Sequence, residues 1–197
     1  MADISVRTSL RRSPLGHWTT EFDQLPRGVR IAESPFLTML TVRLDPAGPA
    51  AADVAKALGG ELPTTPCTFV RGGEAELLWL GPDEWLVVAA PGATDRLTGA
   101  LRAAFGEAFG TLTDVSAQRT TLDLTGPLTR DILARGCAVD LHPRAAPAGT
   151  CMQTLLARTG VVLQVRDDTA TAVRLLVRAS FAPHLAAWLV DACAEYW

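Results

Sequence analysis

DVSAQRTTLDLTGPLTRDILARG, residues 114–136, is the stretch that decides the predicted fold. One strand is expected to end at Ser116, and a second to run over 120–124, where leucines alternate with polar side chains. Gly126 and Pro127 then form a turn that leads into a helix. Because strand, turn and helix follow one another without a linker, this stretch predicts an α+β protein.

The helix of this stretch carries signals at both of its ends. Thr125 is a candidate N-cap, and Pro127 suits the first helical turn. The helix is expected to end at Arg135, because Gly136 suits the position just past the last turn. The local signals therefore agree with one another, and they serve as a reference for the rest of the chain.

The same order of elements occurs in both halves of the chain. Strands are expected at 36–44, 67–70, 76–80, 85–90 and 111–116, then at 120–124, 151–157, 161–166 and 173–178; helices are expected at 50–58, 94–105 and 128–135, with a last one from Ser180. Each half thus has the order β-α-β-β-β-α, which predicts two split βαβ, ferredoxin-like repeats, each an antiparallel sheet with helices on one face. We expect an extended N-terminal arm over 1–35, a first repeat over 36–116 and a second over 117–197. No linker separates the repeats, so they should form one fused body.

Composition limits the class of protein. The chain has 197 residues, 48% of them hydrophobic, which suits one large domain or two small ones with a shared core. A net charge of -3 gives no electrostatic reason to expect nucleic acid or an anionic membrane as a partner. Residues 1–20 do not resemble a signal peptide, and no run approaches the ~20 apolar residues of a membrane span. A cytoplasmic location is therefore expected.

The cysteines do not form a recognisable motif. They are Cys67, Cys137, Cys151 and Cys193, far apart and without a CxxC spacing. In a cytosolic protein they are expected to be reduced, mostly buried thiols. Together with three scattered histidines they do not predict a zinc site.

No motif for catalysis is present in the sequence. There is no glycine-rich phosphate loop, no GxSxG and no HExxH. The histidines, His17, His142 and His184, are expected at the surface. The carboxylate pairs at 83–84 and 167–168 fall in predicted turns, where aspartate is a good turn former, so acid–base chemistry is not needed to explain them.

Two aspartates in the central stretch have a possible cationic partner. Asp114 and Asp123 lie near strand ends, and Arg119 lies between them in the sequence. We expect Arg119 to pair with one of them in a structural ion pair. No residue of the chain is therefore assigned a catalytic, cofactor-binding or metal-binding role.

Aromatic residues near both ends of the chain indicate a protein interface. Trp18 and Phe22 lie in the N-terminal arm, and Tyr196 and Trp197 end the chain. Terminal segments are poor places for core residues, whereas aromatic side chains are enriched at interfaces. These residues are candidate contacts with another subunit, although Trp18 and Phe22 can equally anchor the arm to its own domain.

Four segments together resemble a known family. They are LWLGPDEWLVV, DVSAQRTTLDLTGPLTRDILARGCAVDL, AGTCMQTLLARTGVVLQV and RLLVRASFAPHLAAWLVDA. In combination they are similar to the gamma subunit of heterotetrameric sarcosine oxidase, from about residue 30 to the end of the chain. More distantly, the DVS…L-TGP-helix pattern is similar to the folate-binding part of the glycine-cleavage aminomethyltransferase.

The resemblance implies a non-catalytic subunit of a bacterial, cytoplasmic complex. In that family the gamma chain assembles with alpha, beta and delta subunits, and the complex oxidises sarcosine to glycine with oxygen, giving hydrogen peroxide and formaldehyde or methylene-tetrahydrofolate. FAD, FMN, NAD and tetrahydrofolate are implied on the partner subunits, with no cofactor on the gamma chain. Its implied role is the assembly and stability of the complex, without nucleic acid or membrane partners.

Two other functions stay open from the sequence. One is a stand-alone folate-binding, one-carbon transferase-like protein, in which Asp114 or Asp123 would hold the pterin. Against it, the cysteine motif KGC-aromatic-x-GQE of the folate proteins is absent, since the comparable region reads AGTCMQT. The other is a cysteine-based redox protein, which would need an exposed thiol of low pKa.

Overall fold

The structure, a computed structural model, describes residues 11–197 and contains two five-stranded antiparallel sheets. Across the first sheet the order is β3 (Phe69–Gly72), β4 (Ala75–Gly81), β5 (Glu84–Ala89), β2 (Thr38–Leu44) and β6 (Gly110–Asp114). Across the second it is β8 (Cys151–Leu156), β9 (Thr159–Val165), β10 (Ala172–Arg178), β7 (Arg119–Thr125) and β1 (Arg30–Glu33). The predicted α+β class is confirmed.

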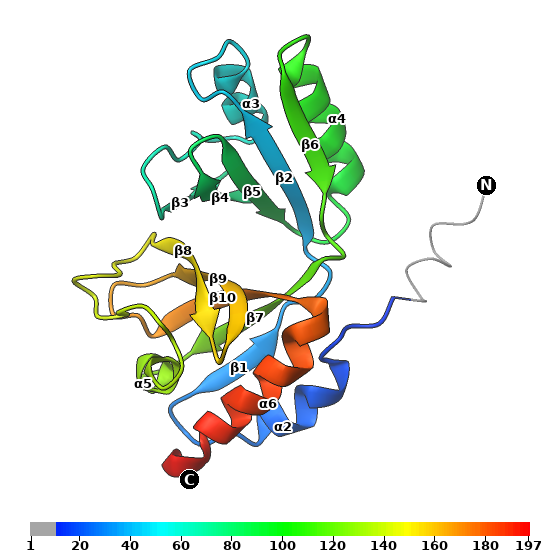
Figure 1. The fold of residues 1–197 in the computed structure, drawn as a ribbon. Coiled ribbons are helices and arrows are strands. Elements are labelled where there is room, and N and C mark those ends of the chain that lie inside the picture. Colours follow the sequence, from blue (N-terminus) through cyan, green and yellow to red (C-terminus); the bar gives the residue numbers. More distant parts are fainter. Residues whose placement is uncertain (1–10) are drawn as a thin grey trace.

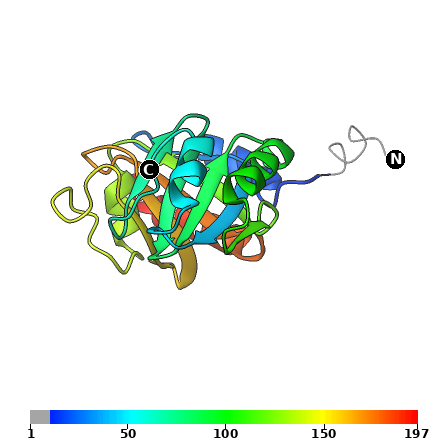
Figure 2. The same ribbon diagram turned by 90° about the horizontal axis from the view of Figure 1, so that it is seen from above.

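Helices cover the outer face of each sheet. They are α2 (Thr19–Asp23), α3 (Ala51–Ala57), α4 (Thr94–Phe105), α5 (Thr129–Ala134) and α6 (Ala182–Ala192), with short 3-10 turns at Gly16–Trp18, Ala179–Phe181 and Ala194–Tyr196. We call the first sheet with α3 and α4 the first lobe, and the second sheet with α2, α5 and α6 the second lobe (Figure 1). Seen from above, α3 and α4 lie over the first sheet (Figure 2) and contact each other.

The two lobes have the same strand plan with one exchange at the edge. The order β2-α3-β3-β4-β5-α4 is followed along the chain by β7-α5-β8-β9-β10-α6, as the sequence predicted. The fifth strand of the first sheet is β6, which follows α4, and the fifth strand of the second sheet is β1, which lies before β2 in the chain. The chain therefore crosses between the lobes twice, side by side (Figure 1), where Val115 donates its backbone N–H to the carbonyl of Met39 at 2.9 Å.

The N-terminal segment corrects the sequence prediction. An extended arm was expected over 1–35; residues 1–10 lie outside the described part of the chain, and residues 11–35 fold onto the second lobe. Leu15 and Phe22 are buried in its core, and β1 pairs with β7 so that Ile31 faces Leu124. The prediction was wrong because β1 has only four residues, too few for a period to show, and its partner lies 89 or more residues further along.

Three apolar layers hold the lobes together. One lies between each sheet and its own helices, and a third lies between the two sheets. Met39, Leu86 and Leu176 belong to the third layer, while their strand neighbours point toward the helices. Strands β5 and β9 are therefore almost continuously apolar, because both of their faces are buried.

Helix starts differ from the predicted caps. Thr125 lies in β7, and α5 begins after Leu128, because pairing with β1 and β10 extends the strand through Thr125. Ser180 lies in a 3-10 turn, and α6 begins at Ala182. Gly136 is needed for close packing, since a Cβ atom there would lie 2.5 Å from the ring of Trp188. Within residues 11–197, no helix is long and apolar enough to cross a membrane.

Candidate functional site

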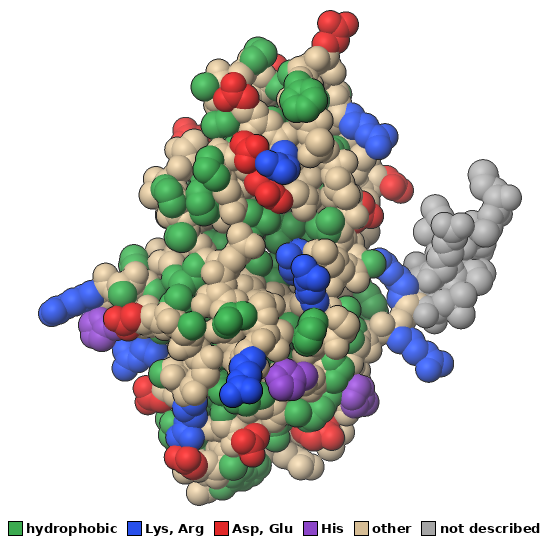
Figure 3. Space-filling view, in the orientation of Figure 1, with side chains coloured by type: hydrophobic (Ala, Val, Ile, Leu, Met, Phe, Trp, Pro, Cys, Tyr) green, Lys and Arg blue, Asp and Glu red, His purple; other side chains and the backbone are tan. Residues whose placement is uncertain are grey.

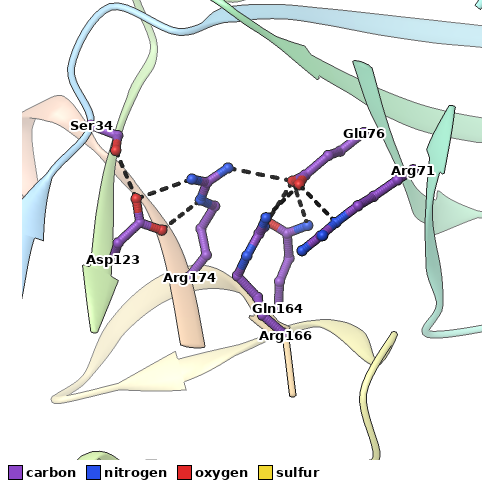
Figure 4. A network of polar contacts seen from close by, with 7 residues as sticks. All are labelled: Ser34, Arg71, Glu76, Asp123, Gln164, Arg166 and Arg174. Atoms are coloured by element: carbon purple, nitrogen blue, oxygen red, sulfur yellow. Dashed lines mark hydrogen bonds and ion pairs between the residues drawn. The ribbon is translucent and has the colours of Figure 1, made fainter. Parts of the chain in front are cut away.

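A cluster of charged and polar side chains joins the two sheets from their inner faces (Figure 4). Glu76 comes from β4 of the first lobe, whereas Asp123, Arg166 and Arg174 come from the second. Arg166 donates two hydrogen bonds to Glu76, from Nη2 to Oε1 at 2.6 Å and from Nη1 to Oε2 at 2.9 Å. Arg174 binds Asp123 with Nε to Oδ1 at 2.7 Å and Nη2 to Oδ2 at 3.0 Å, and its Nη1 lies 3.4 Å from Glu76 Oε2.

Three further side chains complete this inter-sheet ion network (Figure 4). Gln164 donates to Glu76 at 3.2 Å, Ser34 donates to Asp123 at 2.7 Å, and Arg71 Nε lies 3.5 Å from Glu76. Two carboxylates are thus surrounded by three guanidinium groups, and each carboxylate receives several donors. Arginine forks match carboxylates in this two-point geometry, which fixes the register between the parts they join.

The electrostatics of the network keep both carboxylates ionised. Burial on its own raises the pKa of Glu76, but the hydrogen bonds and charge of Arg166 outweigh it, so the pKa is lowered. For Asp123 burial likewise opposes ionisation, and the hydrogen bonds from Arg174 and Ser34 reverse the effect and lower the pKa. A carboxyl held ionised in this way cannot act as a general acid near neutral pH. The arrangement is that of a structural clamp between the sheets.

A small cavity lies beside the clamp. It has a volume of about 280 Å³ and is lined by the β3–β4 turn, the end of β5 and the side chains of Glu76 and Arg174. Ligand pockets in proteins usually measure ~300–1,000 Å³. The four charged residues at its wall are already paired, Arg71 and Arg174 with Glu76 and Glu74 with Arg96, so the cavity offers little free polar chemistry.

The aspartates considered for pterin binding have other partners. Asp123 is held by Arg174, and exposed Asp114 accepts hydrogen bonds from the backbone N–H and the hydroxyl of Ser116, at 2.9 and 2.5 Å. The expected pairing of Arg119 with either aspartate is wrong. Arg119 lies four positions from Asp123 along β7, so their Cα atoms are ~13 Å apart at 3.3 Å per residue. This separation is too large for an ion pair.

The aspartates that the sequence placed in turns, Asp83 and Asp167, form ordinary structural contacts. Asp83 pairs with Arg43 at 2.9 Å on the surface. Asp167 accepts backbone N–H bonds from Thr171 at 2.8 Å and Ala172 at 3.0 Å. Burial opposes the ionisation of Asp167, but these hydrogen bonds and those from the hydroxyls of Thr171 and Thr169 together outweigh it and lower the pKa. Asp167 therefore stabilises the turn in which the sequence placed it, whereas Asp83 links its turn to β2 through Arg43.

The thiols and imidazoles do not converge on one point. All four cysteines are free; Cys151 and Cys193 are buried, and Cys67 is exposed. Burial raises the pKa of Cys151 to about 12 and that of Cys193 to about 11. Over residues 11–197, no three His, Cys, Asp or Glu side chains are grouped so as to hold a metal ion.

The candidate interface residues differ in how much surface they offer. Phe22 is only 6% exposed and belongs to the core of the second lobe, where Trp18 stacks on it with ring centroids 6.3 Å apart. Tyr196 is half-buried beneath the guanidinium of Arg135. Trp197 is 73% exposed. Trp197 is therefore the member of this set that presents most of its ring to the outside.

One exposed aromatic residue was missed from the sequence. Phe109, in the loop between α4 and β6, is 96% exposed and lies at the wall of a 590 Å³ cavity formed with Pro46 and Pro82. Its sequence signal is the segment FGEAFG, which places this phenylalanine next to glycine between the predicted helix at 94–105 and the predicted strand at 111–116. On the face drawn in Figure 3, apolar side chains are scattered in small groups among charged ones.

Comparisons with known proteins agree with one another over most of the chain. A model of the "Sarcosine oxidase, gamma subunit family" matches residues 43–195. The sarcosine oxidase subunit gamma of Corynebacterium sp. (strain P-1) is 38% identical over 194 residues, covering 96% of this chain and 93% of that protein. The subunit of the same name from Arthrobacter sp. is 38% identical over 192 residues, with the same coverage.

Solved structures agree with these sequences. A chain of the heterotetrameric sarcosine oxidase from Corynebacterium sp. U-96, in complex with pyrrole 2-carboxylate, superposes with a TM-score of 0.86 at 34% identity. The match covers 95% of this chain and 96% of that chain. The glycine cleavage system aminomethyltransferase T from Bartonella henselae has a TM-score of 0.64 at 15% identity, covering 90% of this chain and 49% of that one. At that identity the likeness shows a shared fold only.

Proposed function

The chain belongs to the sarcosine oxidase gamma subunit family, and we propose that it serves as the non-catalytic gamma subunit of a heterotetrameric sarcosine oxidase. The observation that carries this proposal is the match to a chain of a solved heterotetrameric enzyme over 96% of that chain. The complex would oxidise sarcosine to glycine with oxygen in the cytoplasm, giving hydrogen peroxide and formaldehyde or methylene-tetrahydrofolate. FAD, FMN, NAD and tetrahydrofolate would be held by the alpha and beta subunits, and the delta subunit would complete the assembly.

A role in assembly and stability is supported by the chemistry of the polar groups. The carboxylates with lowered pKa are committed to arginines or to turn N–H groups, and the buried thiols have raised pKa values. Perturbed groups at catalytic sites are typically poised near the operating pH, which none of these shifts achieves. The groups instead stabilise a rigid body that other subunits can pack against.

The terminal aromatic residues are proposed to contribute to the subunit contact. Trp197 is exposed and half-buried Trp18 stacks on the core residue Phe22, whereas Tyr196 packs against the core of the second lobe. Exchange of Trp197 for alanine should weaken co-purification with the other chains while leaving the thermal midpoint of the isolated chain unchanged. Equal recovery of the partners with both proteins would remove Trp197 from the interface.

The matching order of strands and helices in the two halves supports the interpretation that the chain consists of two split βαβ repeats. The boundaries 36–116 and 117–197 place one complete β-α-β-β-β-α order in each repeat. In this interpretation β6 and β1 are additional edge strands. β6 completes the sheet of the first repeat, and β1 completes the sheet of the second, although neither belongs to the β-α-β-β-β-α order. The exchange ties the repeats together and makes separate folding of either half unfavourable.

A stand-alone folate-binding, one-carbon transferase-like protein is the second candidate. It is favoured by the fold shared with aminomethyltransferase T. It requires a free acidic group for the pterin, and Asp123 is bound by Arg174. Calorimetric titration of the isolated chain with tetrahydrofolate separates the two functions. Measurable heat of binding would support the folate-binding protein, whereas an absence of binding heat would support the gamma subunit.

The direct experiment is recovery of the chain from its native lysate through an affinity tag. The gamma-subunit function predicts that larger chains accompany it, that the eluate absorbs as a flavoprotein, and that sarcosine causes it to release hydrogen peroxide. A colourless eluate that contains this chain alone would contradict the function.

A further inference from the structure

Arg119 and Arg178 lie on the inner face of the second sheet, at the end away from the inter-sheet ion network. Among residues 11–197 they have no carboxylate partners like those of Arg166 and Arg174. Arg119 begins β7 and Arg178 ends β10, and the register of the sheet places them directly opposite each other. Directly opposed residues have Cβ atoms ~4.5–5.5 Å apart, and like charges in such a pair destabilise the sheet. Arg178 lies two residues from Leu176 and thus on the same face, toward the layer between the sheets.

No carboxylate oxygen of residues 11–197 pairs with either guanidinium within ion-pair distance. Arg119 donates a hydrogen bond to the side chain of Gln118, a neutral acceptor. Glu84 acts on Arg119 only from a distance, and its own near partner is Arg43 at 4.0 Å. Burial lowers the pKa of Arg119, and the charge of Arg178 lowers it further. Within the described residues the two guanidinium groups thus form a positive site with no carboxylate at ion-pair distance.

The two arginines line a groove that has room for an incoming side chain. Its volume is about 490 Å³, and its wall includes Gln153, Thr154, Leu155 and Gly160 of the β8–β9 hairpin. Leu155 is 54% exposed, so an apolar surface adjoins the charges. A Cβ atom added at Gly160 would meet no heavy atom within 4 Å, which shows that the groove is open at that point. We call this feature the Arg119–Arg178 groove.

We propose that the Arg119–Arg178 groove receives an aspartate or glutamate side chain from a neighbouring subunit of the oxidase. The inference rests on the proposed function, which supplies such a neighbour. Two adjacent guanidinium groups that pair with no acid of residues 11–197 fit a carboxylate through charge-assisted, two-point hydrogen bonds. The exposed Leu155 favours a peptide over a free anion, because an interface typically combines an apolar centre with arginine contacts.

The test uses the co-expressed complex and two independent changes to the groove. Arg178→Glu reverses one charge. Its matched control is Arg144→Glu, at an exposed arginine that forms no side-chain ion pair with any residue the structure describes. Gly160→Leu fills the groove and keeps both arginines, with Gly160→Ala as its small counterpart. The dissociation constant of the tagged chain from the other subunits is measured for each variant at low and high salt, after thermal melts show that each variant folds.

We expect Arg178→Glu to raise the dissociation constant at least tenfold at low salt. High salt should reduce the difference between the variant and the wild type, because it screens charge. Gly160→Leu should weaken association at both salt concentrations, while both controls behave as the wild type. Wild-type affinity for both groove variants would overturn the proposal and leave the gamma-subunit function standing. Should Arg178→Glu fail to fold, Gly160→Leu decides.

A free anion is distinguished in the same experiment with inorganic phosphate. Arg178-dependent thermal stabilisation of the isolated chain by phosphate, combined with unchanged assembly of the groove variants, would assign the groove to a small anion and contradict the proposal. A wild-type chain that associates with no flavin-bearing partner would refute the proposed function, and the inference with it.

Discussion

Arg174 and Asp123 face each other in register on neighbouring strands and form a two-point ion pair, with Nε–Oδ1 at 2.7 Å and Nη2–Oδ2 at 3.0 Å. The same guanidinium reaches Glu76 of the other lobe, so one side chain links a pair within a sheet to a contact between sheets. The clamp between the lobes is therefore built on the regular pairing of β7 with β10.

Loss of this link should destabilise the whole chain. Arg174→Ala leaves Asp123 without its main partner and removes one cation from Glu76, which should lower the free energy of unfolding by about 2 kcal/mol, since a hydrogen bond to a charged group contributes ~1.5–3 kcal/mol. Urea denaturation measures the change. Arg43→Ala, which removes an exposed ion pair with Asp83, is the control and should have a much smaller effect. Equal losses for the two variants would mean that the clamp has no special role.

The clamp also predicts how stability depends on pH. The pKa values of Glu76 and Asp123 are lowered in the folded state, so the stabilisation they supply is complete above the unfolded values of ~4.3 and ~3.9 and is lost as pH falls through the folded values. Unfolding titrations between pH 7 and pH 2.5 should show this loss in the wild type. The Asp123→Asn variant should be less stable at neutral pH and lose less on acidification; a parallel decline would refute the assignment.

Thiol reactivity should separate the cysteines of the isolated chain. Cys67 is exposed and should react with a disulfide reagent in the native state, whereas Cys151, buried with a pKa of about 12, should react only on unfolding. The colour released by such a reagent counts the fast thiols. Cys67→Ser should abolish the fast phase, and a fast phase that survives this exchange would place a reactive thiol elsewhere and reopen the redox function.

The N-terminal segment should be part of the folded unit. Phe22→Ala removes a ring from the core of the second lobe and should cost about 3 kcal/mol of stability, near the lower end of the range for buried phenylalanine. Phe181→Ala, at an exposed phenylalanine near α6, is the matched control and should cost far less. Chemical denaturation of both variants provides the measurement. Similar midpoints would indicate that residues 11–35 pack only loosely.

Local patterns predicted most of the two repeats. The strand that includes Thr120 and Leu124 was found because apolar and polar residues alternate there, and α4 was found because Leu97 and Leu101 recur at helical spacing. These signals depend only on near neighbours in the sequence. They therefore survive without any knowledge of how the sheets are arranged.

Long-range pairing explains what the sequence could not predict. Glu76 and Arg166 are 90 residues apart, and their contact exists only because two sheets face each other. Arg119 was assigned an acidic partner nearby in sequence, whereas the register places Arg178 opposite it. Strand β1 was missed because its four residues gain stability from β7, not from their own pattern. Register and sheet packing decide all three cases, and neither is visible in a short window.

Native mass spectrometry of the other oxidase chains, co-expressed with and without this chain, tests the central claim most directly. With the chain present, the account predicts a four-chain, flavin-bearing particle that oxidises sarcosine. Without it, the account predicts an incomplete particle of lower thermal stability. A particle of the remaining chains that keeps its full stability and activity in the absence of this chain would contradict a role in assembly.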